Sequence, residues 1–248
     1  MTLRLYVKRV CALLLDLDDT SLDGSSFPQT VTRTCEELAS LRTGLEARQL
    51  QEANHTVFAN YGPERLDAWT LGRLSGAELA VEAWRRTLQA CGNHDDALAQ
   101  FAAKTHLRFA WESYQPFPDV AGLMSAVRQA RVPIALVTNG AADTQRIKIE
   151  ALGIASSFSA LSISGETGVA KPDKRAFAVV LKALGESGKH VWHVGDSLAT
   201  DVAGANAAGL TSVWLNRGGK ERGKSDAQPD LEVTSLADLT PYILRGVR

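Results

Sequence analysis

Short apolar runs recur along the chain, and each ends at a polar or glycine-containing turn. Apolar and polar positions do not alternate within these runs, which is typical of strands buried on both faces of a parallel sheet. The pattern predicts five strands, at Val10–Leu15, Ile134–Val137, Leu161–Ile163, Val191–Val194 and Ser212–Leu215.

Helical periodicity separates these strands from about Pro118 to the C-terminus. Apolar residues recur with helical spacing after Pro172, and Gly185 is placed to end that helix. Asp143 is expected to cap the helix that ends near Gly153. The alternation of strand and helix predicts an α/β fold with a doubly wound, Rossmann-like parallel sheet and right-handed crossovers.

Residues 22–115 interrupt this alternation. They contain no clear strand, and helical stripes dominate them, including one that passes through Trp84. The interval is far longer than an ordinary connection between a strand and a helix. We therefore expect residues 22–115 to form an inserted α-helical domain, and residues 1–21 and 116–248 to form the α/β core.

Composition narrows the class of partner and the compartment. The chain has 248 residues, with 27 Lys and Arg against 28 Asp and Glu, so its net charge of −1 gives no general attraction to a nucleic acid polymer or an anionic membrane. Three cysteines without CxxC spacing argue against a disulfide framework or a zinc site. The apolar run Val10–Leu15 is too short to span a bilayer. These features predict a cytoplasmic protein. A monomer or a homodimer is expected, and the sequence does not distinguish the two.

Polar residues gather where the predicted strands end. Asp16 and Asp18 follow the first strand, Thr138 follows the second, and Asp196 follows a later one, with Asp201 five residues further on. Ligands of doubly wound sheets bind at the carboxyl ends of the strands, so these side chains are expected to converge. Crowded carboxylates repel one another unless a cation lies among them, and oxygen ligands suit Mg²⁺.

This set of residues fits the needs of phosphoryl transfer, which are an in-line nucleophile, positive charge on the phosphate oxygens and a proton donor. Asp16 can serve as the nucleophile and become an aspartyl phosphate. Asp18 points to the same side and could protonate the leaving oxygen and then activate water. Lys171 could supply positive charge. The candidates for holding phosphate oxygens are Thr138, Asn139 and Gly140.

Four motifs resemble those of the haloacid dehalogenase-like hydrolase superfamily. They are Asp16-Leu17-Asp18-Asp19-Thr20, Val137-Thr138-Asn139-Gly140, Lys171-Pro172-Asp173, and Gly195-Asp196-Ser197 with Asp201. The resemblance implies that Asp16 is the nucleophile and Asp18 the general acid/base. It implies a Mg²⁺ ion bound by Asp16, the backbone carbonyl of Asp18, and Asp196. It implies for Asp201 either a contact with the metal through water or a role in holding Lys171, and for the helical insert the role of a mobile cap.

A longer match narrows the branch of the superfamily. Thr144-Gln145-Arg146 and Lys148, with Trp214-Leu215-Asn216, are similar to the N-acylneuraminate-9-phosphatase and nucleotidase-like members, which dephosphorylate small phosphorylated metabolites. Asp18 favours a phosphatase, because true dehalogenases usually lack this second acid. We therefore expect a Mg²⁺-dependent phosphatase that hydrolyses a sugar phosphate or nucleotide through an aspartyl phosphate. A haloacid dehalogenase, a phosphomutase and a non-catalytic phosphate-binding protein are the alternatives.

Other conspicuous residues are expected to have structural roles. His193 falls within an apolar strand and is expected to be a core histidine with its hydrogen bonds satisfied. Trp84 lies on a helical stripe and is expected to pack inside the helical insert. Arg85 and Arg86 are expected to lie on a solvated face of that insert.

Overall fold

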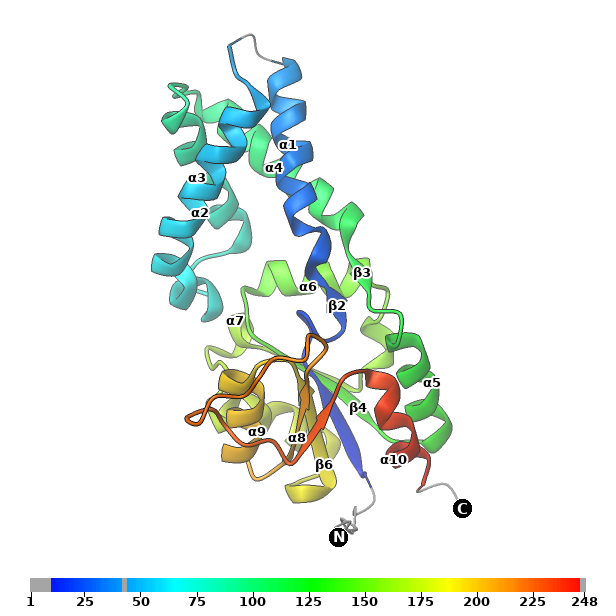
Figure 1. The fold of residues 1–248 in the computed structure, drawn as a ribbon. Helices are drawn as coiled ribbons and strands as arrows, with labels where there is room; N and C mark the ends of the chain where they lie inside the picture. Colours follow the sequence, from blue (N-terminus) through cyan, green and yellow to red (C-terminus); the bar gives the residue numbers. More distant parts are fainter. Residues whose placement is uncertain (1–9, 42–43, 246–248) are drawn as a thin grey trace.

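The computed structural model describes residues 10–41 and 44–245, and a six-stranded parallel sheet lies at its centre (Figure 1). The order across the sheet is β5-β4-β1-β6-β7-β8, and every neighbouring pair is parallel. The strands are β1 (Ala12–Leu15), β4 (Ile134–Thr138), β5 (Ala160–Ile163), β6 (Val191–Gly195), β7 (Thr211–Leu215) and β8 (Leu231–Val233). The doubly wound α/β fold predicted from the sequence is confirmed.

The first five of these strands correspond to the five predicted apolar runs, whereas the sequence pattern did not predict β8. Leu231–Val233 has three residues and lies at the edge of the sheet, where its central Glu232 is exposed. Only Val233 of the three residues is buried, so β8 lacks the continuous apolar run that identified the other five strands.

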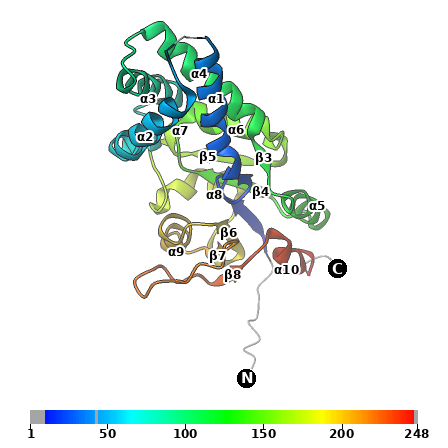
Figure 2. The ribbon, with the colours of Figure 1, turned by 45° about the horizontal axis from the view of Figure 1, so that its top comes forward.

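Alternate residues of β1 face opposite layers of helices. Leu13 and Leu15 pack in the cluster that includes α5 (Val120–Ala130), α6 (Ala142–Ala151) and α10 (Thr240–Leu244). Ala12 and Leu14 pack on the other face, in the cluster that includes α8 (Ala178–Leu184) and α9 (Ala203–Ala207). Figure 2 shows the sheet between these two layers. Burial on both faces explains why the strand sequence is uniformly apolar.

Four long helices form a cap above the carboxyl ends of the strands (Figure 1). They are α1 (Phe27–Leu41), α2 (Ala47–Thr70), α3 (Gly76–Ala90) and α4 (Asp96–Ser113). They share a hydrophobic core in which Trp84 is fully buried, as the helical stripe predicted. The chain enters and leaves the cap through β2 (Leu22–Asp23) and β3 (Gln115–Pro116), a short antiparallel ribbon in an interval where no strand was expected. Within the described residues, none of the helices is both long and apolar enough to cross a membrane.

Apart from its two chain connections, the cap is held against the core by hydrogen bonds at the N-terminus of α3. The Asp143 carboxylate accepts hydrogen bonds from the backbone N–H groups of Gly76 at 2.9 Å and Ala77 at 3.0 Å. The helix α6 starts at Ala142 and has no side-chain cap. The prediction that Asp143 caps its own helix was therefore wrong, because its carboxylate reaches the cap domain instead. The two parts meet so closely here that a Cβ atom built on Gly76 would overlap the side chain of Thr144.

Candidate active site

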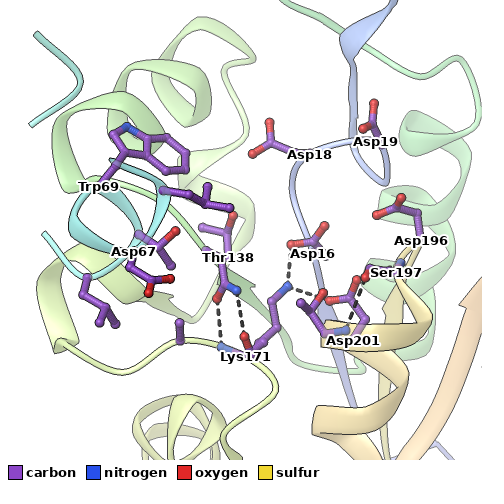
Figure 3. A pocket seen from close by; sticks show the side chains of 16 residues that line it. Asp16, Asp18, Asp19, Asp67, Trp69, Thr138, Lys171, Asp196, Ser197 and Asp201 are labelled. Atoms are coloured by element: carbon purple, nitrogen blue, oxygen red, sulfur yellow. Dashed lines mark hydrogen bonds and ion pairs between the residues drawn. The ribbon is translucent and has the colours of Figure 1, made fainter. Parts of the chain in front are cut away.

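All of the predicted site residues except Gly140 line one cavity between the sheet and the cap, with a volume of about 450 Å³ (Figure 3). From the core, the loops after β1, β4 and β6 supply the predicted acids and polar groups, and the segment after β5 supplies Lys171. From the cap, the C-terminal end of α2 supplies the opposite wall. The lining residues of that wall are Leu66, Asp67, Trp69, Thr70 and Leu71.

Lys171 lies at the floor of this cavity and joins two of the acids. Its Nζ donates hydrogen bonds to Asp16 Oδ1 and Asp201 Oδ1, both at 2.6 Å, and to the carbonyl oxygen of Val137 at 2.8 Å. Burial by itself would lower the pKa of Lys171, but the charges of Asp16 and Asp201 outweigh it and raise the pKa above its usual value. Lys171 is therefore a permanent positive charge beside Asp16.

Asp16 occupies an environment that opposes its ionisation. Burial raises its pKa to about 8; Lys171 acts against this rise, while the negative charges of Asp201 and Asp18 add to it. A single lysine therefore does not compensate for the crowding of carboxylates at this point. A further cation bound here would favour the ionised form that a nucleophile requires.

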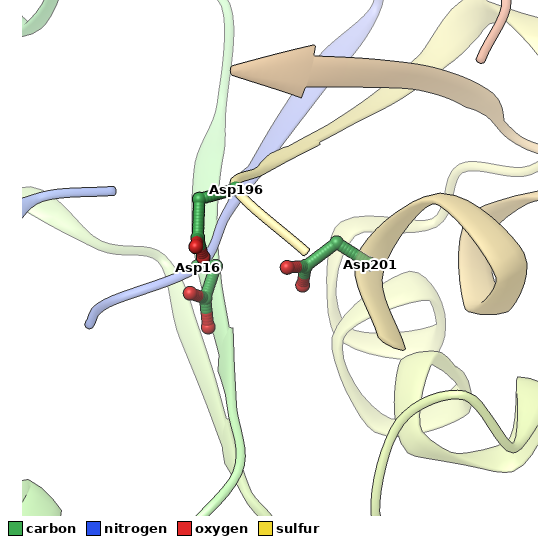
Figure 4. A group of neighbouring side chains, drawn as sticks. All are labelled: Asp16, Asp196 and Asp201. Carbon is green, nitrogen blue, oxygen red and sulfur yellow. The ribbon is translucent and has the colours of Figure 1, made fainter. Parts of the chain in front are cut away.

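Three carboxylates, one from the loop after β1 and two from the segment that follows β6, point toward one another, as Figure 4 shows. Oxygen atoms of Asp16, Asp196 and Asp201 lie within 4.8 Å of one another. Burial raises the pKa of Asp196 to about 6, and the charges of Asp201 and Asp19 contribute to the rise. A set of hard oxygen donors that repel one another fits a Mg²⁺ ion. The metal roles of Asp16, Asp18, Asp196 and Asp201 stay predictions.

Asp201 has protein partners on both carboxylate oxygens. Its Oδ1 bonds to Lys171 and to His193 Nε2 at 3.0 Å, and its Oδ2 accepts from the backbone N–H of Ser197 at 3.0 Å. Burial opposes ionisation, but Lys171 and His193 lower the pKa of Asp201 below its usual value. The hydrogen bond to Lys171 is the contact expected if Asp201 holds Lys171. A contact between Asp201 and the metal through water stays a prediction.

His193 is a supporting residue of the site that sequence reasoning treated as part of the core. It is buried on β6, and burial lowers its pKa, so the ring is neutral near pH 7. Its bond to Asp201 fixes the acid that in turn holds Lys171. The sequence offered only a weak signal, a histidine at a strand position that otherwise calls for an apolar residue.

Asp18 lies on the cavity wall and is held from the side of α6. Lys148 Nζ donates to Asp18 Oδ1 at 2.7 Å and to Oδ2 at 3.0 Å. Gln145 Nε2 lies 3.0 Å from Asp18 Oδ2 and 2.6 Å from Thr138 Oγ1. In the sequence, Lys148 and Gln145 were identified only as part of a longer motif, and their spacing did not predict these contacts.

Asn139 and Gly140 already have partners within the protein. The Asn139 side chain accepts from the backbone N–H of Lys171 and donates to the Lys171 carbonyl, both at 2.9 Å, so it connects two of the motifs. The N–H of Gly140 donates to Ser164 Oγ at 2.9 Å and would have to exchange this partner to hold a phosphate oxygen. Thr138 and Asn139 line the cavity, but Gly140 does not. The three substrate-binding assignments stay predictions.

Two known phosphatases are similar to this chain in sequence. A phosphoserine phosphatase from Thermus thermophilus is 33% identical over 92% of this chain and 96% of its own length. Human N-acylneuraminate-9-phosphatase is 36% identical over 52% of each chain, in agreement with the branch suggested by the longer motif.

Solved structures match nearly the whole chain. The putative HAD-hydrolase YfnB from Bacillus subtilis, bound to magnesium, superposes with a TM-score of 0.68 at 25% identity, covering 95% of this chain and 99% of that one. A 2-haloacid dehalogenase from Pseudomonas syringae pv. Tomato has the same fold, with a TM-score of 0.67 at 23% identity and coverage of 95% and 99%. The family model of haloacid dehalogenase-like hydrolases matches residues 11–209. The chain therefore belongs to the haloacid dehalogenase-like hydrolase family.

Proposed function

We propose that this hydrolase is a Mg²⁺-dependent phosphatase that cleaves a small phosphomonoester through an aspartyl phosphate on Asp16. The observation that carries the proposal is the second acid, Asp18, on the wall of the cavity that also contains Asp16. A leaving alkoxide needs a proton, whereas a leaving halide does not, so this acid favours phosphate over halide chemistry. The phosphatases among the relatives support the same reaction class.

The first step forms a bond between Asp16 and phosphorus. Lys171 occupies Asp16 Oδ1, which leaves Oδ2 as the attacking atom. The bond between phosphorus and the substrate oxygen breaks, and Asp18 gives its proton to that oxygen. Thr138 and Lys171 stabilise the negative charge of the phosphate oxygens. When bound by Asp16, the Asp18 carbonyl and Asp196, Mg²⁺ would neutralise the charge that Lys171 leaves uncompensated.

The second step returns Asp16 to its starting form. Asp18, which has lost its proton in the first step, takes a proton from water, and the water oxygen attacks phosphorus. The bond between phosphorus and Asp16 breaks, and inorganic phosphate leaves. The same carboxyl group thus acts first as an acid and then as a base.

The helical insert supplies the part of the site that meets the leaving group. We assign residues 22–115 to this cap, and its contribution to the cavity wall at the end of α2 is the main support. A cavity of about 450 Å³ accommodates a small metabolite such as a sugar phosphate or a nucleotide. The odd number of cysteines and the lack of CxxC spacing support a cytoplasmic location.

The test is hydrolysis of p-nitrophenyl phosphate with and without Mg²⁺. Asp16→Asn is expected to abolish release of inorganic phosphate while the thermal unfolding midpoint stays close to that of the wild type. Asp226→Asn, the same substitution at an exposed position, is the matched control and should retain full activity. An Asp16→Asn protein that remained fully active would contradict the proposed mechanism.

The same assay separates the alternatives. A haloacid dehalogenase would release halide from a 2-haloacid and continue to work in the presence of a chelator. A phosphomutase would need a bisphosphate activator and would yield an isomer in place of free phosphate. A phosphate-binding protein would bind inorganic phosphate saturably and release none from a broad substrate panel.

A further inference from the structure

Lys148 is a buried ammonium group whose position the proposed reaction does not yet explain. Its side chain is 7% exposed, and it does not line the cavity. Among the described residues its hydrogen bonds go to Asp18 alone, while the Phe27 ring lies 6.0 Å from Nζ. A buried charge costs free energy that an apolar side chain of similar volume would avoid. The stability of the fold therefore does not explain a lysine at this position, whereas the contact with Asp18 does.

Gln145, three residues before Lys148 on α6, contacts the same carboxylate. It is fully buried, and its Nε2 faces Asp18 Oδ2, Thr138 Oγ1 and the carbonyl oxygen of Asn139, the last at 3.1 Å. A carboxylate and a carbonyl only accept hydrogen bonds, so the NH₂ group of Gln145 must point toward them. Gln145 thus joins the candidate acid/base to the candidate phosphate-binding residue.

The contacts from Lys148 and Gln145 matter because the side chain of Asp18 is partly exposed. Its side chain is 35% exposed, so water competes for its oxygens, and without partners the carboxylate would occupy several rotamers. Proton transfer requires the donor within hydrogen-bond reach of the leaving oxygen. Bonds from Lys148 to both oxygens and from Gln145 to one of them restrict Asp18 to a single orientation on the cavity wall.

We propose that Lys148 and Gln145 are positioning residues for Asp18, and that they hold its carboxyl group where it can serve the leaving group and then water. The proposal rests on the proposed function, because it assigns to both residues an effect that passes through Asp18. Neither residue is expected to contact the substrate's leaving group. Their contribution should therefore depend on how strongly the leaving group needs a proton.

The test compares two substrates that differ in this need. An alkyl phosphate leaves as a strongly basic alkoxide, whereas p-nitrophenyl phosphate leaves as a stable phenolate that departs without a proton. For Lys148→Met, kcat/KM is expected to fall about 10- to 100-fold with the alkyl phosphate and less than about threefold with p-nitrophenyl phosphate. Lys148→Arg, which keeps a cation, should recover part of the loss. Lys182→Met, at an exposed position on α8, is the matched control and should change neither value.

A double-mutant cycle tests whether the effect passes through Asp18. In the Asp18→Asn background, Lys148→Met should change kcat/KM for the alkyl phosphate by less than about twofold, since the group that it positions is gone. Equal losses for both substrates in Lys148→Met would overturn the proposal and indicate a structural role. A further loss in the Asp18→Asn background would also overturn it, because Lys148 would then act on the substrate directly.

Other outcomes identify a failure of the proposed function itself. Full activity of Asp16→Asn would remove the phosphatase mechanism. An Asp18→Asn protein with equal losses for both substrates would remove the acid role of Asp18, and with it the proposal for Lys148. If Lys148→Met did not fold, Gln145→Leu with the same two substrates would decide the question. Gln145→Leu is expected to show the larger loss with the alkyl phosphate, and equal losses with both substrates would overturn the proposal.

Discussion

Replacing Asp143 by alanine is expected to loosen the cap and to lower activity, although Asp143 lies outside the cavity lining. Its carboxylate holds the N–H groups of Gly76 and Ala77, which are the first two donors of α3. The third donor, Glu78, is satisfied within the cap by Ser75 Oγ at 3.1 Å. One helix terminus is therefore capped partly by its own domain and partly by the core.

The size of the effect follows from these contacts. Loss of a helix N-cap costs about 0.5–2 kcal/mol, and loss of a negative charge at a helix N-terminus costs about 0.3–1 kcal/mol. We expect Asp143→Ala to destabilise the docked cap by about 2 kcal/mol, which is a factor of about 30 in the ratio of docked to undocked protein. If only the docked form turns over substrate and the starting ratio of docked to undocked protein is below about 6, kcat/KM falls by about 5- to 30-fold.

The assay combines urea unfolding with steady-state hydrolysis of p-nitrophenyl phosphate. Ser75→Ala is the matched control, because it removes a cap from the same helix without breaking a contact with the core. Ser75→Ala is expected to cost about 1 kcal/mol in stability and to leave kcat/KM within about twofold of the wild type. If Asp143→Ala also left kcat/KM unchanged, the contact would be a simple helix cap, and the link between docking and activity would be refuted.

Three further predictions concern the metal, the pH dependence of stability and a glycine. Asp196→Asn should raise the Mg²⁺ concentration for half-maximal activity by at least about 10-fold, and an unchanged Mg²⁺ titration would exclude Asp196 as a ligand. Burial alone would raise the pKa of Asp119, but hydrogen bonds from Arg217 and Ser235 lower it below the unfolded value of 3.8. The ionised carboxylate therefore stabilises the fold above pH 3.8, and this stability is lost as the pH falls through the lower pKa of the folded state. Urea unfolding should therefore show Asp119→Asn to be less stable by about 2 kcal/mol at pH 6, with a smaller difference below pH 3.8, and a constant difference would contradict this assignment. Gly140→Ala should lower both stability and activity, because φ is +144° and the new Cβ would meet Trp69 Cη2 at 2.7 Å; a variant with wild-type unfolding and kcat/KM would show that the cap does not pack there as described.

The sequence by itself determined five of the six strands of the sheet and most of the predicted residues that line the cavity. Parallel strands buried on both faces must be continuously apolar, so five short runs were enough to predict the five strands from β1 to β7 that lie in this sheet. The carboxyl ends of such strands meet at one edge of the sheet whatever the intervening loops do. Asp16, Thr138 and Asp196 could therefore be placed together although they are far apart along the chain, whereas Lys171 was assigned to the site from its motif.

Only the tertiary structure decided which side chains hold these groups. Asp143 reads locally as a cap for its own helix, and the packing of α3 against α6 gives it different partners 66 and 67 residues away. Lys148 reads as an ordinary helical lysine, yet the rotation of α6 about its axis brings its ammonium group to Asp18, 130 residues earlier. His193 reads as part of a strand, and the turn after β6 brings Asp201 back to it. Periodicity reports which face of an element is buried, whereas partners depend on the rotation and separation of elements, which the packing of the whole chain sets.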